Sequence, residues 1–244
     1  MQIQAGRERP GASRQALVTG LLADALASVT PAGRAPELLD CGGGSGTYAV
    51  PLAVAGASVT VVDISADALA TLVRRAGEDG VSDRVRPVQG DAESLGDLVP
   101  ADFFDLVLAH GVLEAVDDVP GAFAGLAAAV RPGGLLSVLV GNPAAGVVAR
   151  ALAGEPAAAL AELRALDTPG TRVGPDAVER LCSAAGLAVE ARHGIGVFSD
   201  LVPGAALDAP GARAALVQLD AAAADRSPFA EIAGRVHLLA RRPG

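Results

Sequence analysis

Short apolar runs alternate with longer amphipathic segments along the first 140 residues of the chain. Val59-Thr60-Val61-Val62 is rich in β-branched residues and too short for a helix, which is typical of a buried strand. We expect five such strands, at 37–41, 58–63, 84–89, 103–109 and 134–140. Between them, apolar residues at helical spacing predict helices at 46–55, 66–78 and 115–130. This alternation predicts a parallel α/β sheet with right-handed crossovers.

The flanking segments extend the pattern at both ends. Residues 13–29 predict an amphipathic helix that Ser13 caps. After Asn142-Pro143, the alanine-rich residues 143–170 predict a helical insertion. The rest of the chain predicts a helix, a strand, helical segments and a final strand, at 175–185, 187–197, 205–224 and 232–241.

Glycines stand at alternate positions in the loop after the first strand, Asp40-Cys41-Gly42-Gly43-Gly44-Ser45-Gly46. Glycine tolerates positive φ and has no Cβ to block a ligand, and Asp40 adds an acceptor just before the turn. Asp63 ends the second strand, where a carboxylate can chelate the two ribose hydroxyls of a nucleoside. The spacing predicts a nucleoside-binding βαβ unit. A dinucleotide is the poorer fit, because Thr47 stands where its fingerprint requires a third small residue.

The arrangement Asp40-x-Gly42-x-Gly44-x-Gly46 resembles motif I of the class I S-adenosylmethionine-dependent methyltransferases. Later blocks at 85–93, 104–110 and 131–138 extend this resemblance over residues 36–141. It implies an α/β, Rossmann-like class I methyltransferase fold, with a mostly parallel seven-stranded sheet, helices on both faces and S-adenosyl-L-methionine as cofactor. In that class the acidic residue after the third strand accepts from adenine. The cofactor-binding residues that the resemblance implies in these loops are Asp40, Gly42, Gly43, Gly44, Asp63, Ile64, Asp91 and Ala92.

Further segments are similar to the bacterial tRNA 5-carboxymethoxyuridine methyltransferase family, and the likeness extends over nearly the full length. They are 13–17, 110–114, 194–200, 227–229 and 234–243. In that family an arginine of the N-terminal helix holds the cofactor carboxylate, and Arg14 takes that place, a task that suits a bidentate guanidinium. His110 matches a histidine that lies beside the cofactor.

The chain departs from that family on the substrate side. The family has a lysine cluster in the insertion, whereas this insertion has Arg150 and Arg164. A family arginine is replaced by Gly196, and the following histidine and tyrosine become Ser199 and Leu201. If that arginine binds the carboxylate of the substrate, this chain lacks the residue that recognises it.

We expect one domain over residues 1–244, with a small helical cap. It comprises an N-terminal helix in 1–35, a cofactor-binding core in 36–141, the insertion in 142–175 and a segment in 176–244 that completes the sheet. Insertions that follow strands near a ligand commonly become lids or substrate walls.

Composition narrows the partners and the compartment. The chain contains no lysine; residues 1–130 hold 8 Arg against 17 Asp and Glu, and residues 131–244 hold 11 against 11. This distribution of charge provides no basic stripe for binding a nucleic acid, and it is compatible with a local arginine patch. No run approaches the roughly 20 apolar residues of a membrane span, and the N-terminus lacks a signal-peptide core. We expect a cytoplasmic protein without a membrane partner. The two cysteines and three histidines show no ligand spacing, so no metal is implied.

The expected activity is methyl transfer to an oxygen or nitrogen nucleophile, a carboxylate among them. A carboxylate is already ionised and needs no base, whereas a hydroxyl or amine can use His110 as proton acceptor. Packing against the cofactor is the other role for His110. Three alternatives remain open: methyl ester formation on a tRNA wobble carboxymethoxyuridine, methylation of a small metabolite, and a cofactor-binding scaffold without catalysis.

Overall fold

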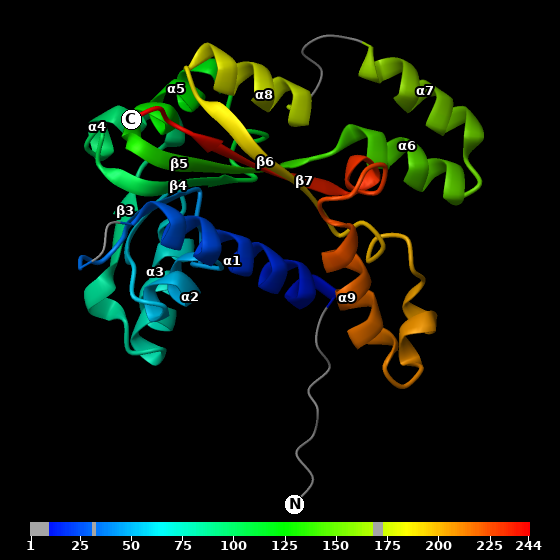
Figure 1. Ribbon diagram of the computed structural model, residues 1–244, viewed down its shortest axis with the longest axis horizontal. Helices are drawn as coiled ribbons and strands as arrows, with labels where there is room; N and C mark the ends of the chain where they lie inside the picture. Colours follow the sequence, from blue (N-terminus) through cyan, green and yellow to red (C-terminus); the bar gives the residue numbers. More distant parts are fainter. Residues whose placement is uncertain (1–9, 31–32, 168–172) are drawn as a thin grey trace, which may run out of the picture.

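The computed structural model describes residues 10–30, 33–167 and 173–244. Its centre is a seven-stranded sheet in the order β3-β2-β1-β4-β5-β7-β6 (Figure 1). The strands are β1 (Glu37–Cys41), β2 (Ser58–Asp63), β3 (Val85–Gln89), β4 (Phe104–His110), β5 (Val130–Gly141), β6 (Ala188–Ile195) and β7 (Arg235–Arg241).

The first five strands run parallel, and β7 is antiparallel to both of its neighbours, β5 and β6. The prediction of a mostly parallel, seven-stranded sheet is thereby confirmed. Because parallel strands share a direction, the loops after β1, β2, β3 and β4 meet along one edge of the sheet.

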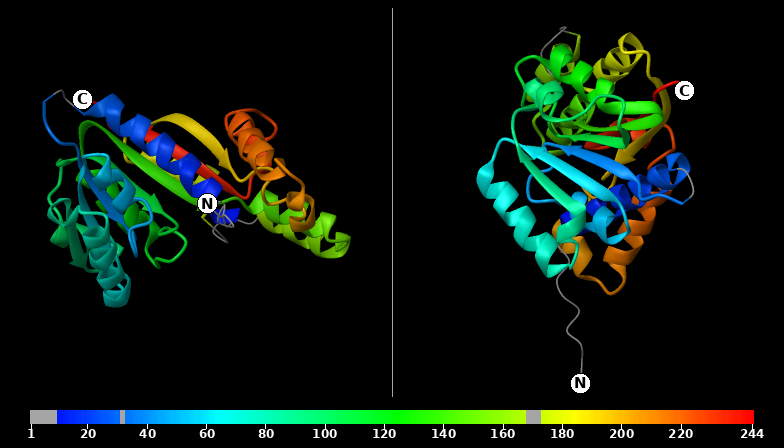
Figure 2. Two further views of the ribbon diagram at one scale, coloured as in Figure 1. Left: turned by 90° about the horizontal axis from the view of Figure 1, so that it is seen from below. Right: turned by 90° about the vertical axis from the view of Figure 1, so that its left-hand side faces the viewer.

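Helices cover both faces of the sheet (Figure 2). One face carries α1 (Pro10–Val29), α2 (Ala49–Val54) and α3 (Ala66–Glu78), and the other carries α4 (Leu95–Leu98), α5 (Val119–Ala129) and α8 (Pro175–Ala184). Successive strand residues supply the two cores: Leu38 packs in the first and Leu39 in the second, because side chains alternate along a strand.

Helix α3 shows how local sequence sets an element. The Ser65 hydroxyl accepts a hydrogen bond from the Ala68 amide at 3.2 Å and caps the helix. Leu69, Leu72 and Ala76 are buried at helical spacing, so one face of α3 packs on the sheet. The helix ends at Glu78, as predicted.

Three helices start at other residues than predicted. Helix α1 begins at Pro10, so Ser13 lies inside it and is not its N-cap. Helix α5 begins at Val119 rather than at 115, because the Asp118 carboxylate caps it by accepting from the Gly121 amide at 3.0 Å. Helix α2 begins at Ala49 rather than at 46, since the glycine loop continues for two residues beyond Gly46.

The described part of the insertion forms two helices, α6 (Pro143–Leu152) and α7 (Pro156–Leu166), which project beyond the sheet (Figure 1). We call this pair the helical arm. Among its described residues, Ala159 alone is buried. Helix α9 (Ala212–Ala223) and the short helix η3 (Gly204–Asp208) occupy the predicted segment 205–224.

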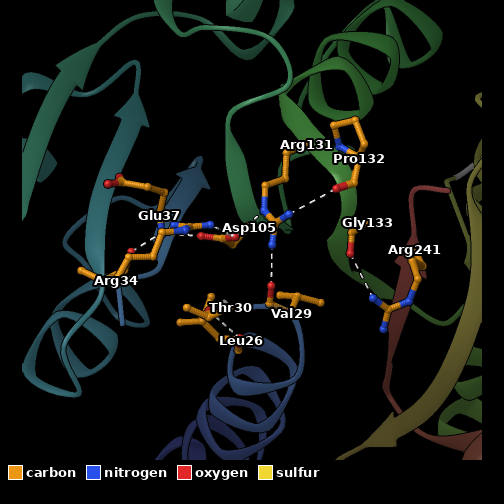
Figure 3. Close-up of polar contacts among 11 residues, drawn as sticks. Leu26, Val29, Thr30, Arg34, Glu37, Asp105, Arg131, Pro132, Gly133 and Arg241 are labelled. Carbon is orange, nitrogen blue, oxygen red and sulfur yellow. Dashed lines mark hydrogen bonds and ion pairs between the residues drawn. The ribbon is translucent and has the colours of Figure 1, made fainter. Parts of the chain in front are cut away.

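A buried carboxylate, that of Asp105, joins three strands at the end of the sheet opposite the loops that follow β1 and β2 (Figure 3). Asp105 is fully buried near the start of β4 and pairs with the guanidinium groups of Arg34 and Arg131. The amide of Glu37 also donates to it, at 2.8 Å. Burial acts to raise the pKa of Asp105, but these hydrogen bonds outweigh it and leave the pKa below its ordinary value. This ion cluster ties β1, β4 and β5 together and lies away from the loops that follow β1 and β2.

Candidate cofactor site

A cavity of about 300 Å³ opens where β1, β2, β3 and β4 end. Its walls come from four loops, each of which follows a different strand. The lining residues are Gly42, Val62, Asp63, Ile64, Gly90, Asp91, Ala92, Glu93, Gly111, Val112, Ala115, Val116 and Asp117. This is the edge at which open α/β sheets bind ligands.

Asp63 connects the second strand to the glycine loop. Its Oδ2 accepts a hydrogen bond from the Gly44 amide at 2.8 Å, and its Oδ1 accepts from the Ser65 amide at 2.8 Å. Each carboxylate oxygen has two lone pairs, so both oxygens can accept one further hydrogen bond from a ligand. The backbone thus orients the carboxylate at the cavity wall.

Asp40 lies beneath the glycine loop and is 1 % exposed. A Cβ at Gly43 would stand 2.6 Å from Asp40 Oδ2 and 2.8 Å from Val61 Cγ1, so only glycine fits there. Burial, with a smaller effect of Asp63, raises the pKa of Asp40 to about 7. Its Oδ2 is buried without a hydrogen-bond partner among the described residues.

Asp91 and Glu93 close the far wall of the cavity. The Asp91 carboxylate accepts from the Glu93 amide at 3.0 Å. The Glu93 carboxylate accepts from the amides of Asp117 and Asp118 at 2.7 and 2.6 Å. Glu93 therefore holds the loop after β4 against the loop after β3.

His110 ends β4, next to the wall formed by Gly111 and Val112. The ring of Tyr48 stands edge-on to it, with the ring centroids 4.9 Å apart. His110 Nε2 lies 2.8 Å from the Ser137 hydroxyl, and Nδ1 is buried without a hydrogen-bond partner among the described residues. Burial, with His237 and Arg235 nearby, lowers the pKa of His110 well below its ordinary value. The imidazole is therefore neutral at pH 7.

Arg14 lies outside this cavity. Its guanidinium pairs with Asp200 at 2.9 Å, and it lines a separate cavity of about 160 Å³ with Gly196 and Asp220. A Cβ at Gly196 would stand 3.0 Å from Arg14 Cδ, so the absent side chain at 196 makes room for Arg14.

The structure brings together most of the predicted cofactor residues. Gly42, Asp63, Ile64, Asp91 and Ala92 line the cavity, and Asp40, Gly43 and Gly44 form the loop and its support. His110 and Arg14 do not line it. Some lining residues were not predicted as site residues, among them Glu93, Val112 and Asp117. The signal for Glu93 was its position two residues after Asp91, in a loop that was predicted to bind the cofactor.

Comparison with known proteins decides the class of protein. Residues 39–138, which contain the glycine loop, Asp63 and Asp91, match the family model "Methyltransferase domain". The chain is a methyltransferase. S-adenosylmethionine is its methyl donor, in agreement with the predicted cofactor, and the residues at the cavity fit this donor: glycines allow close backbone approach and Asp63 offers acceptors for ribose.

Two known proteins that are similar to this chain in sequence are themselves methyltransferases. The tRNA 5-carboxymethoxyuridine methyltransferase of Escherichia coli K12 is 28% identical over 241 residues, which cover 96% of this chain and 89% of the relative. A ubiquinone biosynthesis O-methyltransferase of Chelativorans sp. BNC1 is 33% identical over 159 residues, covering 65% of this chain and 61% of the relative.

Solved structures share the fold. Magnesium protoporphyrin IX methyltransferase from Synechocystis PCC 6803 has a TM-score of 0.62 at 17% identity and covers 99% of this chain and 89% of its own. The cyclase SpnF has a TM-score of 0.62 at 21% identity and covers 98% of this chain and 84% of its own. One fold thus carries different named activities, so the fold alone does not identify the methyl acceptor of this chain.

Within the described ranges, no helix is long and apolar enough to cross a membrane.

Proposed function

We propose that this methyltransferase transfers a methyl group to an oxygen or nitrogen of a small-molecule acceptor. The observation that carries this is the charge of the helical arm. Residues 143–167 hold two arginines against three carboxylates, and Arg150 is paired with Glu155 at 3.3 Å and Glu162 at 2.9 Å. A surface that binds a polyanion needs uncompensated positive charge, so the arm suits a small acceptor better than RNA.

A second cavity supports a small-molecule site. It has a volume of about 860 Å³, within the range of small-molecule pockets, and lies between the arm, α8 and β6. Asn142 lines this cavity and directly follows β5, and β5 is the neighbour of β4 in the sheet. Both signs of charge line it, with Arg150, Arg180 and Arg192 facing the same space as Glu162, Asp176 and Glu231. Such a lining suits a polar acceptor of low net charge.

The residues of the cofactor cavity have separable tasks in this proposal. Asp63 accepts from the ribose hydroxyls, Asp91 accepts from adenine, and the loop of Gly42, Gly43 and Gly44 lets the methionine portion approach the backbone. Bound S-adenosylmethionine supplies a methyl group on a sulfonium sulfur. In-line displacement moves this methyl group to the acceptor with the sulfur as leaving group, and it mainly requires that acceptor atom, methyl group and sulfur be aligned. His110 is available as an unprotonated imidazole for an acceptor that must lose a proton.

A second candidate is a tRNA wobble uridine that carries a carboxymethoxy group. It is favoured by the likeness to the E. coli tRNA enzyme, which spans 96% of this chain. Against it stand the paired Arg150 and the small residue at Gly196, where that family has an arginine.

Transfer of tritiated methyl from S-adenosylmethionine tests the two candidates together. The chain is incubated with a panel of phenols, carboxylic acids and amines, and separately with bulk tRNA. We expect a labelled small-molecule product that separates from S-adenosylmethionine by chromatography, no label in tRNA, and no labelled product with Asp63→Ala. Label in tRNA alone, suppressed by 200 mM salt, would replace the first candidate with the second. Binding of S-adenosylmethionine without any transfer would favour the cofactor-binding scaffold.

A further inference from the structure

The three histidines of the chain meet in the structure. His110 on β4, His237 on β7 and His193 on β6 join through Ser137 on β5. The Ser137 hydroxyl lies 2.8 Å from His110 Nε2 and 2.8 Å from His237 Nε2. His237 Nδ1 lies 3.2 Å from His193 Nδ1. We call these four residues the histidine array.

Strand register explains this meeting. Leu139 pairs with His110 on one side and with His237 on the other, and His237 pairs with His193. Ser137 precedes Leu139 by two residues, so its side chain lies on the same face of the sheet. That face is the one that α1 covers. The array therefore crosses four neighbouring strands, from the end of β4 to β6 at the edge of the sheet.

The burial of these side chains indicates which atom donates in each hydrogen bond of the array. Ser137 and His237 are fully buried, and His193 is partly exposed. His110 Nδ1 is buried without a partner among the described residues, and a buried N–H without an acceptor is rarer and costlier than a bare lone pair. The hydrogen must then lie on His110 Nε2, which donates to Ser137. Ser137 in turn donates to His237 Nε2, and His237 Nδ1 donates to His193 Nδ1.

We propose that Ser137, His237 and His193 are positioning residues that hold His110 as the Nε2–H tautomer, so that its Nδ1 accepts the proton of the methyl acceptor. This inference rests on the proposed function, because a carboxylate acceptor has no proton to give. Tyr48, edge-on to His110, belongs to the glycine-loop segment and links the array to the cofactor site.

The acceptor oxygen or nitrogen forms a bond to the methyl carbon while the carbon–sulfur bond breaks, leaving its electron pair on sulfur. The acceptor's proton moves to His110 Nδ1. His110 Nε2–H passes to Ser137, the Ser137 proton to His237 Nε2, His237 Nδ1–H to His193 Nδ1, and His193 Nε2–H to solvent. The reverse shift, with water taking the proton from His110, restores the array after product release.

The charged surroundings favour this neutral shift over a stationary imidazolium. Arg235 on β7 opposes a positive charge on His110, while Asp225 favours one on His193 at the outer end. Burial, with a smaller effect of His193, lowers the pKa of His237 to about 3. The described residues contain no group of three or more His, Cys, Asp or Glu side chains arranged to hold a metal ion.

Nitrogen-15 labelling of histidine tests the array directly, because the chain has three histidines and hence six ring nitrogens. Two-bond proton–nitrogen correlation spectra assign the tautomer of each ring. In the unchanged protein we expect Nε2–H for His110 and Nδ1–H for His237, constant between about pH 6 and 8. Adding S-adenosylhomocysteine should shift the His110 nitrogens.

Ser137→Ala should convert His110 to a mixture of tautomers. Thr19→Val is the matched control, because it removes a buried hydroxyl that has no hydrogen-bond partner among the described residues, and it should leave the spectra unchanged. A His110 ring that carries Nδ1–H in the unchanged protein, or a pattern that Ser137→Ala does not alter, would overturn the proposal. These spectra do not depend on the acceptor, so failure of the proposed function in the methyl-transfer assay remains distinguishable.

Discussion

The carboxylate of Asp63 accepts a hydrogen bond from the backbone amide of Gly44 at 2.8 Å. This contact joins the end of β2 to the loop that follows β1, and both border the cofactor cavity. A single side chain thus shapes the loop, and in the proposed mode of cofactor binding it also presents acceptors to the ribose. Under that proposal, loss of the Asp63 carboxylate removes a ligand contact and an anchor of the glycine loop together.

Gly43→Ala should destabilise the protein by about 1–3 kcal/mol, because the added Cβ would meet Asp40 and Val61 within 2.8 Å. Gly20→Ala in α1 is the control: nothing lies within 4 Å of its added Cβ, and alanine favours a helix by roughly 0.5–1 kcal/mol. Urea unfolding compares the two. Equal midpoint shifts of the same sign would show that Asp40 does not pack under the loop.

Asp40→Asn should change how stability depends on pH. The pKa of Asp40 is raised to about 7 in the folded protein, so the folded state keeps a proton that the unfolded chain releases near pH 4. Stability from this group is complete below about pH 4 and is lost as pH rises to about 7. The difference in unfolding free energy between the unchanged protein and Asp40→Asn should fall over that window by on the order of 4 kcal/mol. A constant difference would refute the raised pKa.

Asp105→Ala should cost about 3 kcal/mol of stability, because it leaves Arg34 and Arg131 without their carboxylate. Glu190→Ala breaks a surface pair with Arg241 and should cost under about 1 kcal/mol. Thermal unfolding measures both. Neither change should alter the affinity for S-adenosylhomocysteine, and a lowered affinity in Asp105→Ala at a temperature where it is folded would contradict the separation of the two ends of the sheet.

Gly196→Ala tests the predicted role of Arg14. The added Cβ would stand 3.0 Å from Arg14 Cδ and move that side chain. If Arg14 also holds the carboxylate of the cofactor, affinity for S-adenosylhomocysteine should fall about tenfold, the value of one charged hydrogen bond. Gly211→Ala has a similar positive φ, with nothing within 4 Å of its added Cβ, and should leave affinity unchanged. An unchanged affinity in both variants would remove Arg14 from the cofactor site.

The core of the fold was readable from the sequence because buried parallel strands are short, continuous apolar runs. Strands β1 and β2 match the prediction at both ends. Strand β5 begins at Val130, four residues before its predicted start, because the segment through Gly133 stays paired across a register shift opposite Phe104 and Leu106. A bulge of this kind follows from the pairing of two strands, not from the composition of one.

The site was readable only where its residues follow strand ends. Asp63 ends β2 and Asp91 follows the end of β3 by two residues, and both were predicted. The histidine array was not, because His110, His193 and His237 are far apart in sequence and meet only through the register of β4, β5, β7 and β6. The Arg14–Asp200 pair likewise depends on the path of the chain after β6.

Isothermal titration of S-adenosylmethionine into the unchanged protein and into Asp63→Ala tests whether the cofactor binds where β1 and β2 end. Asp97→Ala, which removes a carboxylate from α4 outside the cavity, is the control. We expect micromolar binding to the unchanged protein and to Asp97→Ala, and binding about a hundredfold weaker to Asp63→Ala, as two lost hydrogen bonds to a charged group imply. Equal affinity in Asp63→Ala would place the cofactor elsewhere, and absence of binding to the unchanged protein would contradict the account of this site.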